Sequence, residues 1–425
     1  MMRLVSALLC LHLPVAAFAS KLPDPLSLPQ VMKMANQVDH YTLIDAQADV
    51  VDAQSQRELA ESLLGFSAQL ELQAAYVNPS SVAFDPSSQD NGAVLRLTQP
   101  LYDFGGSSNN IQAAQIDQQA LQARMTYVIN SRKIEIAKQF FEVILSDLKY
   151  AWDNEALSTA YVRYDAVKDR HALLQVSDLA LLESEGRYLD TLHTRNLSEA
   201  QQRYSRAVLA ETLNRPTELP SNLVRPELKF IQAKLPEYAL ILEKVLKNNP
   251  QIMLAEKQQT AAQQRMLAEN QQLSPFLSGE LEVSEYSRAK SNDDVRVALN
   301  LTIPLYESSN IKSRISKARA ALLKQRAQLL SIKAQVRKQA LNVWQTISVL
   351  NKRRQQLQMS QELRELKLDQ NRALYEMEVE TDLGDAMVAI SEIQYEQAKN
   401  EYELALAWME LRLLVGETEI MGATL

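Results

Sequence analysis

Hydrophobic and polar residues alternate along two short stretches of the chain that closely match each other. The first is 93–102, which reads AVLRLTQPLY, and the second is 297–306, which reads VALNLTIPLY. Successive side chains of a β-strand point to opposite faces, so this alternation predicts strands with one apolar and one polar face. The two copies lie 204 positions apart in a chain of 425 residues, which indicates an internal duplication.

Two further stretches alternate in the same way, one ahead of each copy. We therefore expect four strands, at 67–76, 93–102, 277–286 and 294–306. A helix is expected before each pair of strands, at 29–65 and at 236–273. The chain then divides into two structural repeats, 20–220 and 221–425, each running helix, strand, loop, strand, long helix and return helix.

A long proline-free helix is expected after each pair of strands, at 111–174 and 311–378. Apolar residues recur every three or four positions, as in Val336, Ala340, Val343, Ile347 and Leu350, which is the spacing of a coiled-coil seam. At 1.5 Å per residue, each helix is roughly 95 Å long. Shorter helices should return from the tips, at 178–215 and 382–415. The sequence thus predicts an elongated molecule with strands at one end and helical hairpin tips at the other.

The strands are about as long as a membrane-spanning strand, and the helices point away from them. Four strands cannot close a barrel, because about eight is the practical minimum. Three chains would supply twelve. The predicted fold is therefore mainly α-helical with a membrane β-barrel: long helical hairpins, and four strands per chain in a twelve-stranded barrel shared by a homotrimer.

The first residues predict export from the cytoplasm. Arg3, an apolar run and the Ala17–Ala19 segment indicate a signal peptide at 1–19. The sole cysteine, Cys10, lies inside it, so the mature chain would form no disulfide. Loss of Arg3 changes the formal charge to −7 − 1 = −8, which argues against nucleic acid as a partner.

Two Pro-Leu-Tyr junctions between strand and helix, the two matching halves and two tip motifs together resemble the TolC family of outer-membrane efflux proteins. The tip motifs lie near 171–180 and 375–386. The resemblance covers essentially the whole mature chain. It implies a channel in the outer membrane of a Gram-negative bacterium, with its helical part in the periplasm. It also implies three kinds of partner: a periplasmic membrane-fusion adaptor, an inner-membrane transporter reached through the adaptor, and outer-membrane lipid. Such a duct would serve a tripartite efflux or type I secretion system.

The tips depart from the family pattern at two kinds of position. Leu174 and Glu378 occupy the places of the tip glycines, and Ala180 and Gly384 those of an aspartate, although other aspartates stand beside them. By this resemblance the acidic residues of the tips are candidates for the periplasmic aperture: Asp178, Glu378, Glu380, Asp382 and Asp385. The adjoining tip residues are candidates for adaptor contact: Leu173, Leu174, Ser177, Val379 and Thr381. The candidate strand–helix junctions are Pro100, Tyr102, Gly105, Pro304 and Tyr306.

The sequence also permits other interpretations of the acidic tip residues and of the protein's class. Asp178, Asp382 and Asp385 are also suited to helix N-caps or first turns, where carboxylates are stabilising. A soluble periplasmic coiled-coil adaptor would share the long helices but has no use for four strands of membrane length. An enzyme is not expected, because no catalytic constellation is found. His40, His171 and His193 are widely separated. We expect neither a cofactor nor a metal site.

Overall fold

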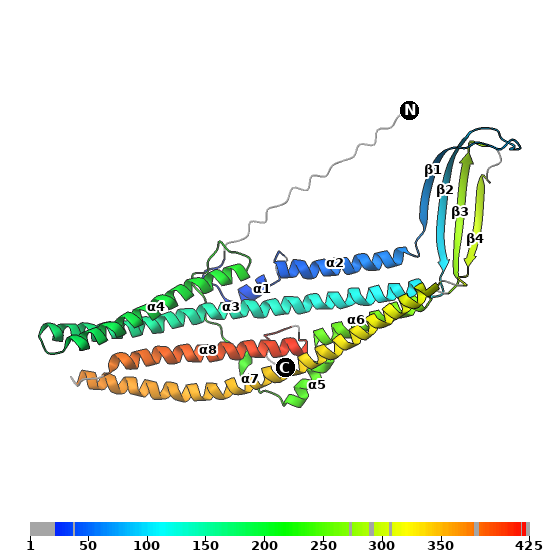
Figure 1. Ribbon diagram of the computed structural model, residues 1–425. Coiled ribbons are helices and arrows are strands. Elements are labelled where there is room, and N and C mark those ends of the chain that lie inside the picture. The colour runs from blue at the N-terminus through cyan, green and yellow to red at the C-terminus, as the bar shows by residue number, and fades with distance from the viewer. Residues whose placement is uncertain are drawn as a thin grey trace.

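The computed structural model describes residues 22–36, 39–271, 274–288, 293–305, 308–377, 382–417 and 419–421. The predicted signal peptide lies outside these residues. The molecule is elongated, with a small sheet at one end and helices running away from it (Figure 1). No helix within the described ranges is both long enough and apolar enough to cross a membrane.

The same order of elements occurs in both halves of the chain. The first half contains α1 (Leu28–Met34), α2 (Tyr41–Ser62), β1 (Ser67–Tyr76), β2 (Gln89–Tyr102), α3 (Gly106–Ala172) and α4 (Asp178–Thr212). After the short 3-10 helix η1 (Lys229–Gln232), the second half contains α5 (Tyr238–Asn248), α6 (Pro250–Asn270), β3 (Phe276–Tyr286), β4 (Val295–Thr302), α7 (Ser308–Glu376) and α8 (Leu383–Val415).

The four strands form one antiparallel sheet in the order β1-β2-β3-β4. The central β2–β3 pairing joins the two halves, with Leu97 opposite Leu281. The last strand is shorter than the predicted 294–306, since β4 runs only from Val295 to Thr302. Pro304 follows shortly afterwards, and a proline has no N–H to donate to a β-ladder. β2, in contrast, starts at Gln89, ahead of the predicted 93–102.

Two long helices set the length of the molecule. α3 has 67 residues and α7 has 69, so each is roughly 100 Å long. Each returns through a hairpin, α3 into α4 and α7 into α8 (Figure 1). α3 also packs against α2, α6 and α8, which places it at the centre of the helical layer.

Each predicted helix ahead of the strands is in fact two helices. The expected helix at 29–65 breaks between α1 and α2, where His40 occupies the N-cap of α2. The expected helix at 236–273 breaks at Asn249, whose side chain accepts hydrogen bonds from the backbone nitrogens of Gln251 (3.0 Å) and Ile252 (3.2 Å). Pro250 then occupies the first position of α6. Asparagine is a favoured N-cap and proline a favoured first helical residue, so this Asn-Pro pair starts a new helix. The break therefore has a local physical reason.

The hydrophobic core lies midway along the molecule, where α1, α5 and η1 meet the long helices. Its largest members include Phe140, Phe141, Tyr402 and Trp408, all fully buried. Phe141 of α3 stacks on Tyr402 of α8 with ring centroids 4.5 Å apart. This contact joins the two halves of the chain far from the sheet.

Candidate functional site at the helix tips and the sheet

The first hairpin tip ends α3 with a left-handed residue. The Leu174 N–H donates to the His171 carbonyl at 2.8 Å, and the Gln175 N–H donates to the Arg170 carbonyl at 2.9 Å. This pair of hydrogen bonds is the Schellman ending of a helix, in which glycine is usual at the left-handed position. Leu174 has φ 58° and is 92% exposed. The departure from the family's glycine therefore leaves the turn intact and presents a leucine to the surroundings.

The residues after Leu174 begin α4. Ser177 is the N-cap, and its hydroxyl accepts from the Ala180 N–H at 3.2 Å. Asp178 lies in the first turn and is almost fully exposed. Its Oδ1 lies 2.7 Å from Nε2 of His171, at the end of α3. Ser177 thus has a definite structural role in capping, while Asp178 contacts the opposite side of the same turn.

The second tip contacts the first hairpin through an arginine that the sequence did not point to. Arg163 of α3 lies 2.7 Å from Asp385 and 3.6 Å from Asp382, both at the start of α8. Asp382 occupies the N-cap position, but its side chain makes no capping hydrogen bond. The hydrogen bond to Asp385 raises the pKa of Arg163, with a further contribution from the charge of Asp382. Both aspartates of the second hairpin therefore contact an arginine of the first hairpin.

Close backbone approach allows this contact. A Cβ added at Gly384 would lie 2.8 Å from Cγ2 of Thr159, so the first turn of α8 sits directly on α3. Four further candidates at this tip lie outside the described residues: Glu378, Val379, Glu380 and Thr381. Sequence spacing alone offers no signal for Arg163, because the residues of this ion pair are far apart in the chain.

The first strand–helix junction is a tight bend. The β2–β3 register shifts between Pro100 and Tyr102, and the Tyr102 ring packs against Phe104 at 4.8 Å between centroids. Gly105 follows with φ 101°, which favours glycine, and occupies the N-cap of α3. Asp103 accepts from the backbone nitrogens of Gly105 (3.2 Å) and Ser107. At the second junction Pro304 follows β4, and Tyr306 lies outside the described residues.

Asp103 was not among the sequence candidates. An Asp-x-Gly segment just ahead of a long helix is a usable signal, because aspartate side chains readily accept backbone N–H groups at helix starts. The bend turns the chain sideways from the base of β2 into α3, as Figure 1 shows.

The two faces of the sheet differ sharply in polarity. Residues opposite one another in the ladder share a face, so Leu70, Leu95, Val283 and Val295 lie on one side. Leu97, Leu281 and Val297 lie on that same side. Val297 is 80% exposed, so no other part of the described chain covers this face there.

The opposite face carries a network of charges. Arg96 lies 3.0 Å from Glu282 and 3.1 Å from Glu280, and Asn300 donates to Glu280 at 3.0 Å. The alternation along 93–102 and 297–306 predicts Leu95, Leu97, Leu299 and Leu301 on one face, and Arg96, Thr98, Asn300 and Thr302 on the other. The register agrees with that split.

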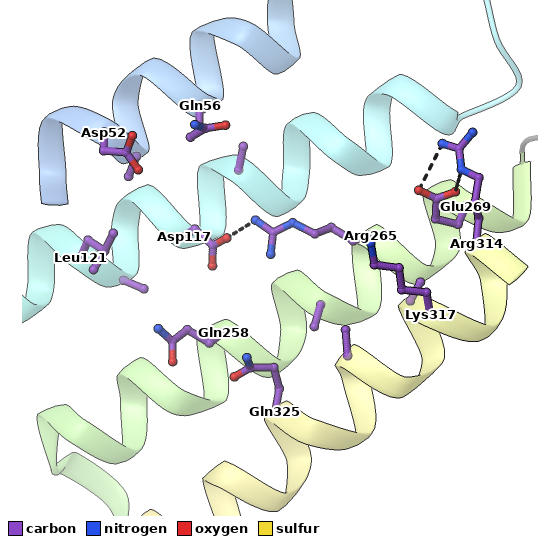
Figure 2. Close-up of a pocket in the computed structure, with 16 residues that line it drawn as sticks. Asp52, Gln56, Asp117, Leu121, Gln258, Arg265, Glu269, Arg314, Lys317 and Gln325 are labelled. Atoms are coloured by element: carbon purple, nitrogen blue, oxygen red, sulfur yellow. Dashed lines mark hydrogen bonds and ion pairs between the residues drawn. The ribbon is translucent and has the colours of Figure 1, made fainter.

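A hollow of about 690 Å³ lies between α2, α3, α6 and α7, towards the sheet end. Figure 2 shows Arg265 reaching Asp117, and Arg314 reaching Glu269, across these helices. The rest of the lining combines small alanine side chains with polar ones, among them Gln56, Gln258 and Gln325. The described residues contain no group of three or more histidine, cysteine or acidic side chains placed to hold a metal ion.

Comparison with known proteins gives the class to which this geometry corresponds. Residues 241–417 match the family model described as outer membrane efflux protein. This match confirms the resemblance predicted from the tip motifs and strand–helix junctions. No curated protein matches the chain.

Solved structures share the fold at low sequence identity. The outer membrane protein VceC of Vibrio cholerae aligns with a TM-score of 0.72 and 15% identity, over 92% of this chain and 96% of that one. The CmeC outer membrane channel of Campylobacter jejuni aligns with a TM-score of 0.74 and 12% identity, over 92% and 85%. The MtrE outer membrane channel of Neisseria gonorrhoeae gives 0.70 and 17%, over 93% and 89%. The fold, mainly helical with a small antiparallel sheet of four strands, is that of outer-membrane channels.

Proposed function

We propose that this protein is a homotrimeric outer-membrane exit duct for a tripartite efflux or type I secretion system. It receives substrates from an inner-membrane transporter through a periplasmic membrane-fusion adaptor and passes them to the outside. The observation that carries the proposal is the uncovered apolar face of the sheet, at the end of the molecule opposite two long helical hairpins. Lipid is the solvent that such a face requires.

A shared barrel accounts for the edges of the sheet. Among the described residues, β1 and β4 each pair with a single strand, so each offers an open row of backbone donors and acceptors. Such rows cannot face lipid unpaired, because no water is present there to bond them. Pairing of β4 with β1 of a neighbouring copy removes every edge when three copies close a ring. The leucine face then meets lipid, and Arg96, Glu280 and Glu282 face the aqueous lumen.

The helical hairpins form the periplasmic part of this duct. The two halves then act as structural repeats, 20–220 and 221–425, each supplying one hairpin, and three chains bring six tips to one mouth. The acidic residues Asp178, Glu378, Glu380, Asp382 and Asp385 surround the aperture. Rings of carboxylates favour cations at a constriction.

The adaptor contacts the exposed tip residues, for which Leu173, Leu174, Ser177, Val379 and Thr381 are the candidates. Leucines 173 and 174 are both well exposed at the end of the first hairpin. The Arg163–Asp385 ion pair keeps the second hairpin against the first in the resting state. Docking would then shift the population towards an arrangement in which the hairpins separate.

Mass measurement of the detergent-extracted protein tests the assembly. We expect three copies per particle, and electrophysiology in planar bilayers should show small, cation-selective conductance. Changing Asp382 and Asp385 to alanine should lower the selectivity. A stable monomer in aqueous buffer without detergent would refute the duct and favour the alternative, a soluble periplasmic adaptor. Unchanged selectivity in the double variant would refute only the assignment of these aspartates to the mouth.

A further inference from the structure

The helical layer has two open edges near the sheet. There α2 packs on α3, α3 on α6, and α6 on α7, so α2 and α7 lie at opposite sides of the layer (Figure 1). The outer side of each of these two helices is exposed. These sides are therefore available to a partner.

Both exposed sides have the spacing of a coiled-coil seam. Apolar or small residues recur at steps of three and four, which places them along one side of a helix. On α2 they are Tyr41, Ile44, Ala48, Val51 and Ser55, and on α7 they are Ala320, Leu323, Ala327, Leu330 and Ala334. Leu323 and Leu330 are 57% and 62% exposed. A regular seam left this open indicates a missing helical partner.

The two edges carry opposite charge. α2 has one cation, Arg57, and its acidic residues are Asp45, Asp49, Asp52, Glu58 and Glu61. From Ser308 to Gln361, α7 has twelve lysines and arginines and no acidic residue. An α2 edge therefore attracts an α7 edge of another copy, while two like edges repel each other.

A row of charge with the same spacing lies beside each seam. The acidic row is Asp45 and Asp52 on α2, and the basic row is Lys317, Lys324 and Lys338 on α7. Seven residues make about two helical turns, so each row keeps to one side of its helix. Asp52 and Lys317 both line the hollow between α2, α3, α6 and α7, so the two rows face the same side of the layer (Figure 2).

Contacts within the chain leave both rows free. All five residues of the two rows are exposed, and none forms an ion pair with any described residue. The charges that do pair point into the layer: Asp49 contacts Arg124 of α3, and Arg314 lies 3.1 Å from Glu269 of α6. The rows are thus the charges that a neighbouring helix would meet.

Contacts across the layer place the two rows at similar distances from the sheet. They run from α2 to α7 through three pairs: Asp49–Arg124, Tyr127–Gln251 and Glu256–Lys333. The middle of α2 is therefore level with the region around Lys333, to within about two helical turns. The basic row extends on both sides of that residue, so it covers the level of the acidic row.

We propose that α2 of one copy packs against α7 of the next copy as an antiparallel helix pair, with the acidic row opposite the basic row. The inference rests on the proposed homotrimer, to which it adds the surfaces and the charge pattern that select the neighbour. α2 runs towards the sheet and α7 away from it, which makes the pair antiparallel (Figure 1). Because each edge accepts only the unlike edge, copies add head to tail until a ring closes.

Cross-linking of the assembled protein in detergent tests the packing. The sequence has one cysteine, Cys10, inside the predicted signal peptide, so introduced cysteines react alone. Val51→Cys is combined in turn with Leu323→Cys, Ala327→Cys and Leu330→Cys and treated with a short bismaleimide. At least one combination should give covalent dimers and trimers, because its two cysteines meet only between copies. Each single variant should give none.

Two charge reversals test the rows. The first is Asp45→Lys with Asp52→Lys, and the second is Lys317→Glu with Lys324→Glu and Lys338→Glu. Either reversal alone should slow trimer formation from dissociated chains about 10-fold at 0.1 M salt and much less at 1 M. Both together should restore the rate. As a matched control, Glu227→Lys with Glu243→Lys changes exposed residues outside both rows and should assemble at the unchanged rate.

The outcomes separate this inference from the proposed duct. A protein that stays monomeric in detergent would refute the duct itself. Trimers that give no cross-link, or that form at the unchanged rate with either row reversed, would overturn the α2–α7 pairing and leave the duct intact. Slowing by the basic-row reversal alone, together with lost binding to phosphatidylglycerol vesicles, would also overturn the pairing and assign the lysines to anionic lipid.

Discussion

Removing the positive charge of Arg163 should shift the channel towards its open state. Arg163 lies 2.7 Å from Asp385 and 3.6 Å from Asp382. Through these two ion pairs, candidate aperture residues of the second hairpin contact the first hairpin. The side chains of Arg163 and Asp385 are about half exposed, at 54% and 53%. Water therefore screens the pair, and a contribution of roughly 0.2–1 kcal/mol is expected from each one.

A trimer multiplies this small contribution. Concerted opening would break three such pairs, or about 0.6–3 kcal/mol in total. That free energy corresponds to a shift of the closed–open equilibrium by roughly 3- to 150-fold. A pair of this kind is also sensitive to salt, because the Debye length falls from about 10 Å at 0.1 M to about 3 Å at 1 M.

Single-channel recording in planar bilayers measures the shift. Arg163→Ala should raise the open probability at 0.1 M salt, and the difference from the unchanged protein should shrink at 1 M. The matched control is Arg187→Ala, which changes an arginine of α4 whose ion pair with Glu183 stays within that helix. It should leave gating unchanged. Exchanging the charges, with Arg163→Asp and Asp385→Arg together, should restore closure.

One result would refute the reasoning directly. If Arg163→Ala and Arg187→Ala gate alike at low salt, the ion pair does not hold the tips together. Failure of the charge exchange alone would instead indicate that Asp382 shares the contact, since it lies 3.6 Å from the same guanidinium.

Three further predictions concern stability. Leu174→Gly should stabilise the first hairpin by about 1 kcal/mol in thermal denaturation, because glycine has no penalty at φ 58°; an unchanged or lower Tm would contradict this. Leu299→Arg should cost about 2–4 kcal/mol in a folding assay in lipid, while Asn300→Arg should be tolerated; the reverse order would invert the assigned faces. His40 has a folded pKa below its unfolded value of about 6.5, so the unfolded state takes up the proton first. Stability is therefore full above that value and falls as the pH drops towards the lower folded pKa, and His40→Gln should flatten the fall.

The strands and the long helices could be predicted from local patterns of apolar and polar residues. β1 occupies the same residues as the predicted strand at 67–76, because alternation over ten residues is itself the period of a strand. Along α7 the predicted seam, from Val336 to Leu350, is buried at each of its positions. Where a second local rule competed, the prediction was wrong: Asn249-Pro250 starts a new helix inside the expected one.

The tip residues were predicted in part. Ser177 and Asp178 could be placed at the start of a helix, because capping depends on residues next to one another in the chain. The left-handed turn at Leu174 could not be foreseen from a leucine, which disfavours that geometry. The partners of the aspartates were also missed, since Arg163 lies on another hairpin.

The sequence by itself determined the period of each element, and hence the strands, the long helices and their return at the tips. These features follow from interactions between residues a few positions apart, which a short window of sequence contains. The tertiary structure alone decided which side chains from distant segments meet. It placed Arg163 against Asp385 and Phe141 on Tyr402. Those contacts depend on how whole helices pack, because a shift of one turn along a helix brings a different residue to the same place.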